Sequence, residues 1–133
     1  PGHQQSMHDA VINAADQGIL FSLAAGNEAD YAEYYEPAHV EHGNVYTISA
    51  VDDSDTVAYF SNYGNPPVDY AAPGVYILST AKGGGTTVMQ GTSMAAPHVC
   101  GILLLRNPPN SGGVAVDDPE NDNDDYPDPI AHL

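Results

Sequence analysis

The sequence predicts an α/β domain with a doubly wound, mostly parallel sheet. Ser6 with Asp9 has the pattern of a helix-capping pair, and the apolar residues that follow at helical spacing stop at Gly18, a helix-ending glycine. A strand-like apolar stretch, residues 19–23, comes directly after that helix, and residues 45–51 are expected to form the next buried strand. A helix that leads straight into a strand is the order found in parallel α/β sheets.

A second predicted helix opens with the most informative run of the chain, Gly-Thr-Ser-Met-Ala-Ala-Pro-His-Val at residues 91–99. Gly91 permits a tight turn, and Ser93 is expected in the first turn of a helix that continues as a buried apolar run over residues 99–105. Pro97 is tolerated because the first N–H groups of a helix have no intrahelical partner. Those groups and the helix dipole would stabilise negative charge on a carbonyl attacked by Ser93. The alternative is a plain helix N-cap.

Residues 24–28, Ala-Ala-Gly-Asn-Glu, form a second informative segment at the end of the first predicted strand. In a parallel sheet, ligand sites gather at the carboxyl ends of strands, which is where Asn27 is expected. A carboxamide there can donate a hydrogen bond to an oxyanion. The alternative is a turn residue, since Asn after Gly is common in turns.

Both segments resemble those of the subtilases, the subtilisin-like serine peptidases, and the resemblance extends over roughly residues 5–105. It implies a subtilisin-like fold in which residues 1–107 are the C-terminal half of a catalytic domain. It also implies a serine endopeptidase with Ser93 as nucleophile and Asn27 in the oxyanion hole, acting on a polypeptide substrate without a cofactor. The residues that this resemblance places around the substrate are Leu23, Ala24, Ala25, Gly26 and Glu28.

The aspartate and histidine motifs of the subtilase triad do not occur in these 133 residues. We therefore expect this chain to need the N-terminal half of the same domain as its partner, and to be inactive alone. His98 lies five residues from Ser93, a rotation of about 500° in a helix, so their side chains are expected to diverge and His98 to be structural. Cys100, the single cysteine, is expected to be a buried apolar residue.

Charge is the strongest compositional signal, with 18 acidic residues against one Lys and one Arg and a net charge of -16. Nucleic-acid binding is excluded as a function class because phosphate neutralisation needs basic residues. No apolar run is long enough to suggest a membrane span. We expect an extracellular protein, whose acidity serves either a high-salt environment or simple solubility.

Residues 108–133 depart from the resemblance and are expected to form an acidic tail or linker that contributes nothing to the core. Its Asp and Asn residues at 117–125 suit calcium, although the EF-hand pattern fails. The resemblance makes Asp69 a better candidate for a structural calcium or monovalent ion, its alternative being a turn cap. Two other functions remain open: a pseudo-peptidase fragment that binds a partner, and an acidic calcium-binding module.

Overall fold

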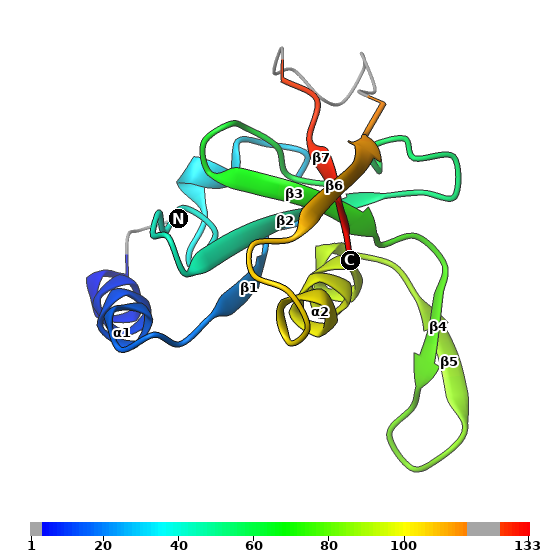
Figure 1. Ribbon diagram of the computed structural model, residues 1–133. Helices are drawn as coiled ribbons and strands as arrows, with labels where there is room; N and C mark the ends of the chain where they lie inside the picture. The colour runs from blue at the N-terminus through cyan, green and yellow to red at the C-terminus, as the bar shows by residue number, and fades with distance from the viewer. Residues whose placement is uncertain (1–3, 117–125) are drawn as a thin grey trace.

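A five-stranded sheet forms the centre of the fold in the computed structural model, which describes residues 4–116 and 126–133 (Figure 1). In spatial order its strands are β1 (Phe21–Ala24), β2 (Val45–Val51), β3 (Val68–Pro73), β7 (Pro129–His132) and β6 (Asn110–Val114). The pairs β1–β2, β2–β3 and β3–β7 are parallel, and only β6 runs antiparallel to its neighbour. The predicted α/β fold with a mostly parallel sheet is confirmed.

Two helices cover opposite faces of this sheet. Helix α2 (Thr92–Leu103) packs on Ile48 and Ala50 of β2, whereas α1 (Gln5–Asp16) shares a cluster with Val45 at the start of the same strand. Successive side chains of a strand point to opposite faces, so residue 45 faces away from residues 48 and 50. The sheet is therefore wound on both sides.

The start of α1 differs from the prediction. The helix begins at Gln5 with Gln4 as N-cap and no side-chain cap hydrogen bond, so the predicted cap at Ser6 is wrong. Because the helix starts one residue earlier, Ser6 is already helical. Asp9 instead accepts a hydrogen bond of 2.8 Å from the Gln5 side chain.

Helix α2 is shorter than predicted and ends at Leu103. Leu104 and Leu105 are 84% and 76% exposed, so the buried apolar run does not extend through residue 105. Pro97 lies inside the helix and not in its first turn. Proline has no N–H group, so it cannot donate to the Ser93 carbonyl one turn earlier.

The predicted acidic tail differs from the structure in its described parts, residues 108–116 and 126–133. Strand β7 pairs with the core strand β3, and Ala115 is buried with Val51. Asp128 is 3% exposed and accepts a hydrogen bond from the Ser49 hydroxyl. This segment therefore closes one side of the sheet. The proposed calcium ligands at 117–125 lie outside the described residues.

A short antiparallel hairpin of β4 (Ile77–Thr80) and β5 (Thr86–Met89) projects from the sheet just before α2 (Figure 1). The 3-10 helix η1 (Ala32–Tyr34) lies in the loop between β1 and β2. Among the described residues, no helix has the length and apolar character that crossing a membrane demands.

Candidate active site

The loop after β1, which carries Asn27, contacts the start of α2, which carries Ser93. Thr92 provides the link, because its backbone N–H donates to Asn27 Oδ1 at 2.8 Å and its hydroxyl donates to the same oxygen at 3.1 Å. The hydroxyl in turn accepts a hydrogen bond of 3.1 Å from the Gly26 backbone N–H. Two segments 65 residues apart are thereby locked together directly beside the exposed Ser93.

Two glycines make this close approach possible. Gly91 has φ 145° and lies under the Asn27 carboxamide, whose atoms would be 3.5–3.6 Å from a Cβ at position 91. Gly26 has φ 112°, and a Cβ there would collide with Asn62 Nδ2. Residues with L side chains rarely adopt either conformation, so the backbone turns of both segments require glycine.

The loop that carries Asn27 is held from behind by buried Asn62. Its carboxamide oxygen accepts a hydrogen bond of 2.8 Å from the Glu28 backbone N–H, and its Nδ2 donates to Ala25 O and to Glu28 Oε2. Glu28 Oε2 also accepts from the Asn27 backbone N–H at 2.9 Å. This network fixes the backbone on which Asn27 sits.

The residues predicted to surround the substrate divide into two groups. Leu23 and Ala24 line a pocket of about 450 Å³ together with Ser93. Ala25 is fully buried in the core, and Glu28 turns one carboxylate oxygen back into its own loop. The structure therefore brings only part of the predicted substrate wall to the serine.

A second pocket, of about 330 Å³, places Ser93 opposite the hairpin before α2. Ile77 and Leu78 line one side, and His98 lines the same pocket. The His98 ring is held by a contact of 2.9 Å between its Nδ1 and the Met94 carbonyl, and no hydrogen bond joins it to Ser93 in the described part of the chain. His98 and Ser93 thus share a pocket without forming a catalytic pair.

Cys100 is exposed, which corrects the prediction of a buried residue. It lines the same pocket as Ser93 and Pro97. Residues 93, 97 and 100 follow the i, i+4, i+7 spacing of one helix stripe, and this exposed stripe borders the pocket beside the edge strand β1. The neighbouring stripe, with Val99 and Leu103, is the one that is buried.

Asp69 on β3 lies apart from this site and has features of a cation ligand. Burial, with the nearby charge of Glu41 adding to it, raises the pKa of its carboxyl from 3.8 to about 6, although a hydrogen bond from the Thr47 backbone N–H opposes the shift. That bond, to Oδ2, is 2.8 Å long. No Lys or Arg forms an ion pair with Asp69 among residues 4–116 and 126–133. A half-buried carboxylate without a basic partner fits a hard cation.

Sequence reasoning missed Thr92 and Asn62 as positioning residues. Thr92 lies in the singled-out segment 91–99 and Asn62 lies outside both informative segments, and each acts through a side chain that is 0% exposed and bonded to a distant segment. A buried polar residue next to a candidate site residue is the signal that could have found them.

Fold and site together define a doubly wound α/β domain with a serine at a helix start and an asparagine at a neighbouring strand end. The sequence profile of the Subtilase family matches residues 1–110. The chain belongs to the subtilase family.

Relatives that the chain matches include subtilisin-like proteases of fungi. Subtilisin-like protease 12 of Arthroderma gypseum is 46% identical over 101 residues, which cover 76% of this chain and 25% of the relative. The subtilisin-like serine protease Pen ch 13 of Penicillium rubens is 46% identical over 99 residues, 74% of this chain and 24% of its own. The chain therefore spans about a quarter of the length of these relatives.

The crystal structure of a cold adapted subtilisin-like serine proteinase superimposes with a TM-score of 0.74 at 39% identity. The match covers 79% of this chain and 37% of that structure. The shared fold confirms the subtilisin-like architecture expected from the two motif segments.

Proposed function

We propose that this chain supplies the nucleophile and the oxyanion hole of a serine endopeptidase. The observation that carries the proposal is the hydrogen bond from the Thr92 N–H to Asn27 Oδ1, next to Ser93. A backbone N–H can only donate, so the atom facing Thr92 is the oxygen, and Nδ2 lies on the other side of the carboxamide. Within the described residues Nδ2 makes no hydrogen bond and stays available as a donor.

In this mechanism Ser93 Oγ attacks the carbonyl of a peptide bond. The charge that develops on the carbonyl oxygen is stabilised by Asn27 Nδ2 and the Ser93 backbone N–H, which belongs to the unpaired donors at the start of α2. The hydroxyl must lose a proton, and no described residue bonds to it as a base. We propose that a histidine and an aspartate from the N-terminal half of the same domain perform this step.

The substrate is a polypeptide whose side chain before the scissile bond lies against Leu23 and Ala24 in the pocket that also reaches Ser93. The acidic Glu28, in the loop after β1, favours tolerance for Lys or Arg. Because one oxygen of Glu28 is bonded within the loop, we expect this preference to be mild. A secreted, extracellular location fits the acidic surface of the chain.

A structural calcium at Asp69 is a separate proposal. The carboxylate and neighbouring carbonyl oxygens would hold the ion, whose charge would offset the cost of burying the ionised Asp69. The ion takes no part in the peptidase chemistry.

A fluorophosphonate probe, which reacts with activated serines, tests the peptidase proposal. The probe is applied to the complete catalytic domain and to this chain alone, and adducts are located by peptide mass spectrometry. We expect labelling of Ser93 in the complete domain and no labelling of the isolated chain. Labelling of the chain alone would show that the base lies within these residues, and an active domain labelled elsewhere would remove Ser93 as nucleophile.

A further inference from the structure

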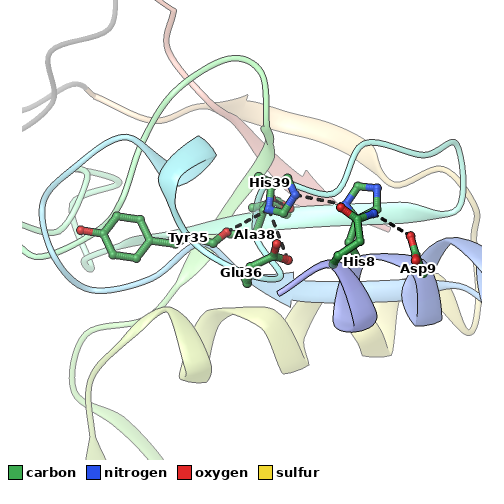
Figure 2. A network of polar contacts seen from close by, with 8 residues as sticks. His8, Asp9, Tyr35, Glu36, Ala38 and His39 are labelled. Atoms are coloured by element: carbon green, nitrogen blue, oxygen red, sulfur yellow. Dashed lines mark hydrogen bonds and ion pairs between the residues drawn. The ribbon is translucent and has the colours of Figure 1, made fainter. Parts of the chain in front are cut away.

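A cluster of His8, Glu36 and His39 lies between α1 and the loop that follows η1 (Figure 2). One ligand atom from each of these residues lies within 4.8 Å of the other two. The three side chains, with Gln5, line a pocket of about 280 Å³ that is separate from the two beside the serine. The peptidase proposal assigns no role to this cluster.

The surroundings of His39 determine which of its nitrogens carries the proton. Its Nδ1 lies 3.4 Å from the Tyr35 carbonyl oxygen and 3.4 Å from Glu36 Oε2 (Figure 2). Both of these oxygens can only accept, so the proton belongs on Nδ1. The lone pair of the neutral ring is then on Nε2, and Nε2 faces His8.

The two histidines present their nitrogens to each other at a distance that suits a shared metal ion. His8 Nδ1 and His39 Nε2 are 3.1 Å apart, and the ring centroids are 5.1 Å apart. Two nitrogens bound at about 2.0–2.1 Å to one tetrahedral ion are separated by roughly 3.3 Å. Small rotations about the χ2 bonds aim both lone pairs at one point.

The carboxylate behind His39 completes a familiar arrangement. A histidine that ligates a metal almost always donates its other ring N–H to a carboxylate or a backbone carbonyl, which fixes the ring and raises its basicity. His39 has both kinds of acceptor at Nδ1, namely Glu36 and the Tyr35 carbonyl.

We propose that His8, Glu36 and His39 form a binding site for one divalent transition-metal ion of the zinc class. His8 Nδ1 and His39 Nε2 are the nitrogen ligands, Glu36 holds the His39 ring through Nδ1–H, and water from the pocket fills the remaining positions. Without the ion, His8 Nδ1–H donates to His39 Nε2. On binding, the His8 proton moves to its Nε2, so both imidazoles stay neutral. Imidazole ligands suit Zn²⁺ better than Ca²⁺ or Mg²⁺.

The ion would connect α1 to the loop ahead of β2. This helix buries only Val11 and Ala15, so a cross-link at His8 reinforces its first turns. A ligand that binds the folded state and not the unfolded state raises the melting temperature. We therefore expect Zn²⁺ to raise the melting temperature of the chain.

Titration with Zn²⁺, followed by calorimetry and by the NMR signals of the histidine rings, tests the proposal. A large excess of Mg²⁺ is kept present to occupy the oxygen sites of the acidic surface. We expect saturable binding of one ion per chain, with shifts of the His8 and His39 ring signals and none at His42, His98 or His132. Because this measurement uses the unmodified chain, it does not depend on the folding of any variant.

Three variants and a matched control sharpen the test. H8Q and H39Q should lose Zn²⁺ binding and the rise in melting temperature, and E36Q should weaken binding by about 10–100-fold, as loss of a carboxylate behind a ligand does. His42 is the control, because its Nε2 lies 3.2 Å from Asp16 Oδ1 without a second histidine, so H42Q should bind like the unmodified chain. Absence of saturable binding, ring shifts at other histidines, or unchanged binding in folded H8Q and H39Q would overturn the proposal.

Discussion

The two helices of this chain are anchored to the sheet in different ways. Helix α2 contacts four strands, β1, β2, β3 and β7, and its first residue is bonded to the end of β1. Helix α1 contributes only Val11 and Ala15 to a cluster near the edge strand, and neither helix has a side-chain cap. The candidate nucleophile therefore sits on the helix that is held in several directions, which suits a site that depends on positioning.

The difference also gives the proposed metal site at α1 a structural use. A helix with little buried surface gains more from an added cross-link than one already fixed by packing. The site beside α2 would perform chemistry, whereas the His8 cluster would hold α1. The following experiments, from the largest expected effect to the smallest, test this contrast.

S93A is expected to have the largest effect on activity. In the complete domain it should lower kcat by about 10⁶-fold, a size taken from subtilisin, where the nucleophile has been removed. Ser93 is exposed, so the melting temperature should not change. Peptidase assays and thermal melts are compared, and retention of most activity would contradict the assignment.

N27D separates the two ends of the Asn27 side chain. The aspartate keeps an oxygen for the Thr92 N–H but loses the Nδ2 donor. We expect kcat to fall by about 10²–10³-fold, the size known for loss of this donor in subtilisin, with little change in KM. Activity near that of the unmodified domain would mean that Nδ2 does not stabilise the oxyanion.

T92V tests the link between the loop after β1 and α2 while keeping both Ser93 and Asn27, although it also removes the hydroxyl's hydrogen bond to Asn27 Oδ1. Valine fits the space but removes a hydroxyl that is 0% exposed, and the Gly26 N–H loses its acceptor. A half-buried donor without a partner costs about 1 kcal/mol of stability, the low end of the range for buried groups. Urea unfolding measures the loss, and T86V in the exposed strand β5 is the control, expected to be neutral.

V99A and V11A compare the packing of the two helices directly. Val99, on the buried side of α2, is 0% exposed, and Val11, on the buried side of α1, is 9% exposed. Removing two buried carbons should cost about 2 kcal/mol at Val99 and about 1 kcal/mol at Val11, since the less enclosed position leaves a smaller cavity. Equal losses in urea unfolding would show that the helices are anchored alike.

D69N tests the half-buried carboxylate of Asp69 on β3 and its proposed role as a calcium ligand. Since the folded-state pKa of Asp69 is raised from 3.8 to about 6, its contribution to stability falls as pH rises through that window in a calcium-free buffer. D69N should therefore melt above the unmodified chain at pH 8 with a chelator, and below pH 4 the difference should vanish. Calcium should raise the melting temperature of the unmodified chain only. An equal calcium response in both would exclude Asp69 as a ligand.

Local pattern was sufficient for α1, β1, β2 and α2 and for the two site segments. The turn at Gly91, the helix after it and the strand before Asn27 all depend on neighbouring residues, and the structure contains each of them. The contact between Asn27 and Thr92 joins residues 65 positions apart, so no local pattern could reveal it.

The errors have the same origin. Cys100 was expected to be buried because the run around it is apolar, but the helix phase places it on the open stripe with Ser93. Strand β7 lies in an acidic segment and was missed, because its pairing with β3 is a long-range contact. The composition of a segment gives its average polarity, but it does not show which strand the segment pairs with.

The most direct test of the central claim is a crystal structure of the complete domain with a peptidyl phosphonate bound to Ser93. The account predicts that a phosphonyl oxygen lies about 2.7–3.1 Å from both Asn27 Nδ2 and the Ser93 backbone N–H, with Oδ1 still on Thr92. An adduct whose oxygen points away from Asn27, or a carboxamide turned so that Nδ2 faces the protein, would contradict it.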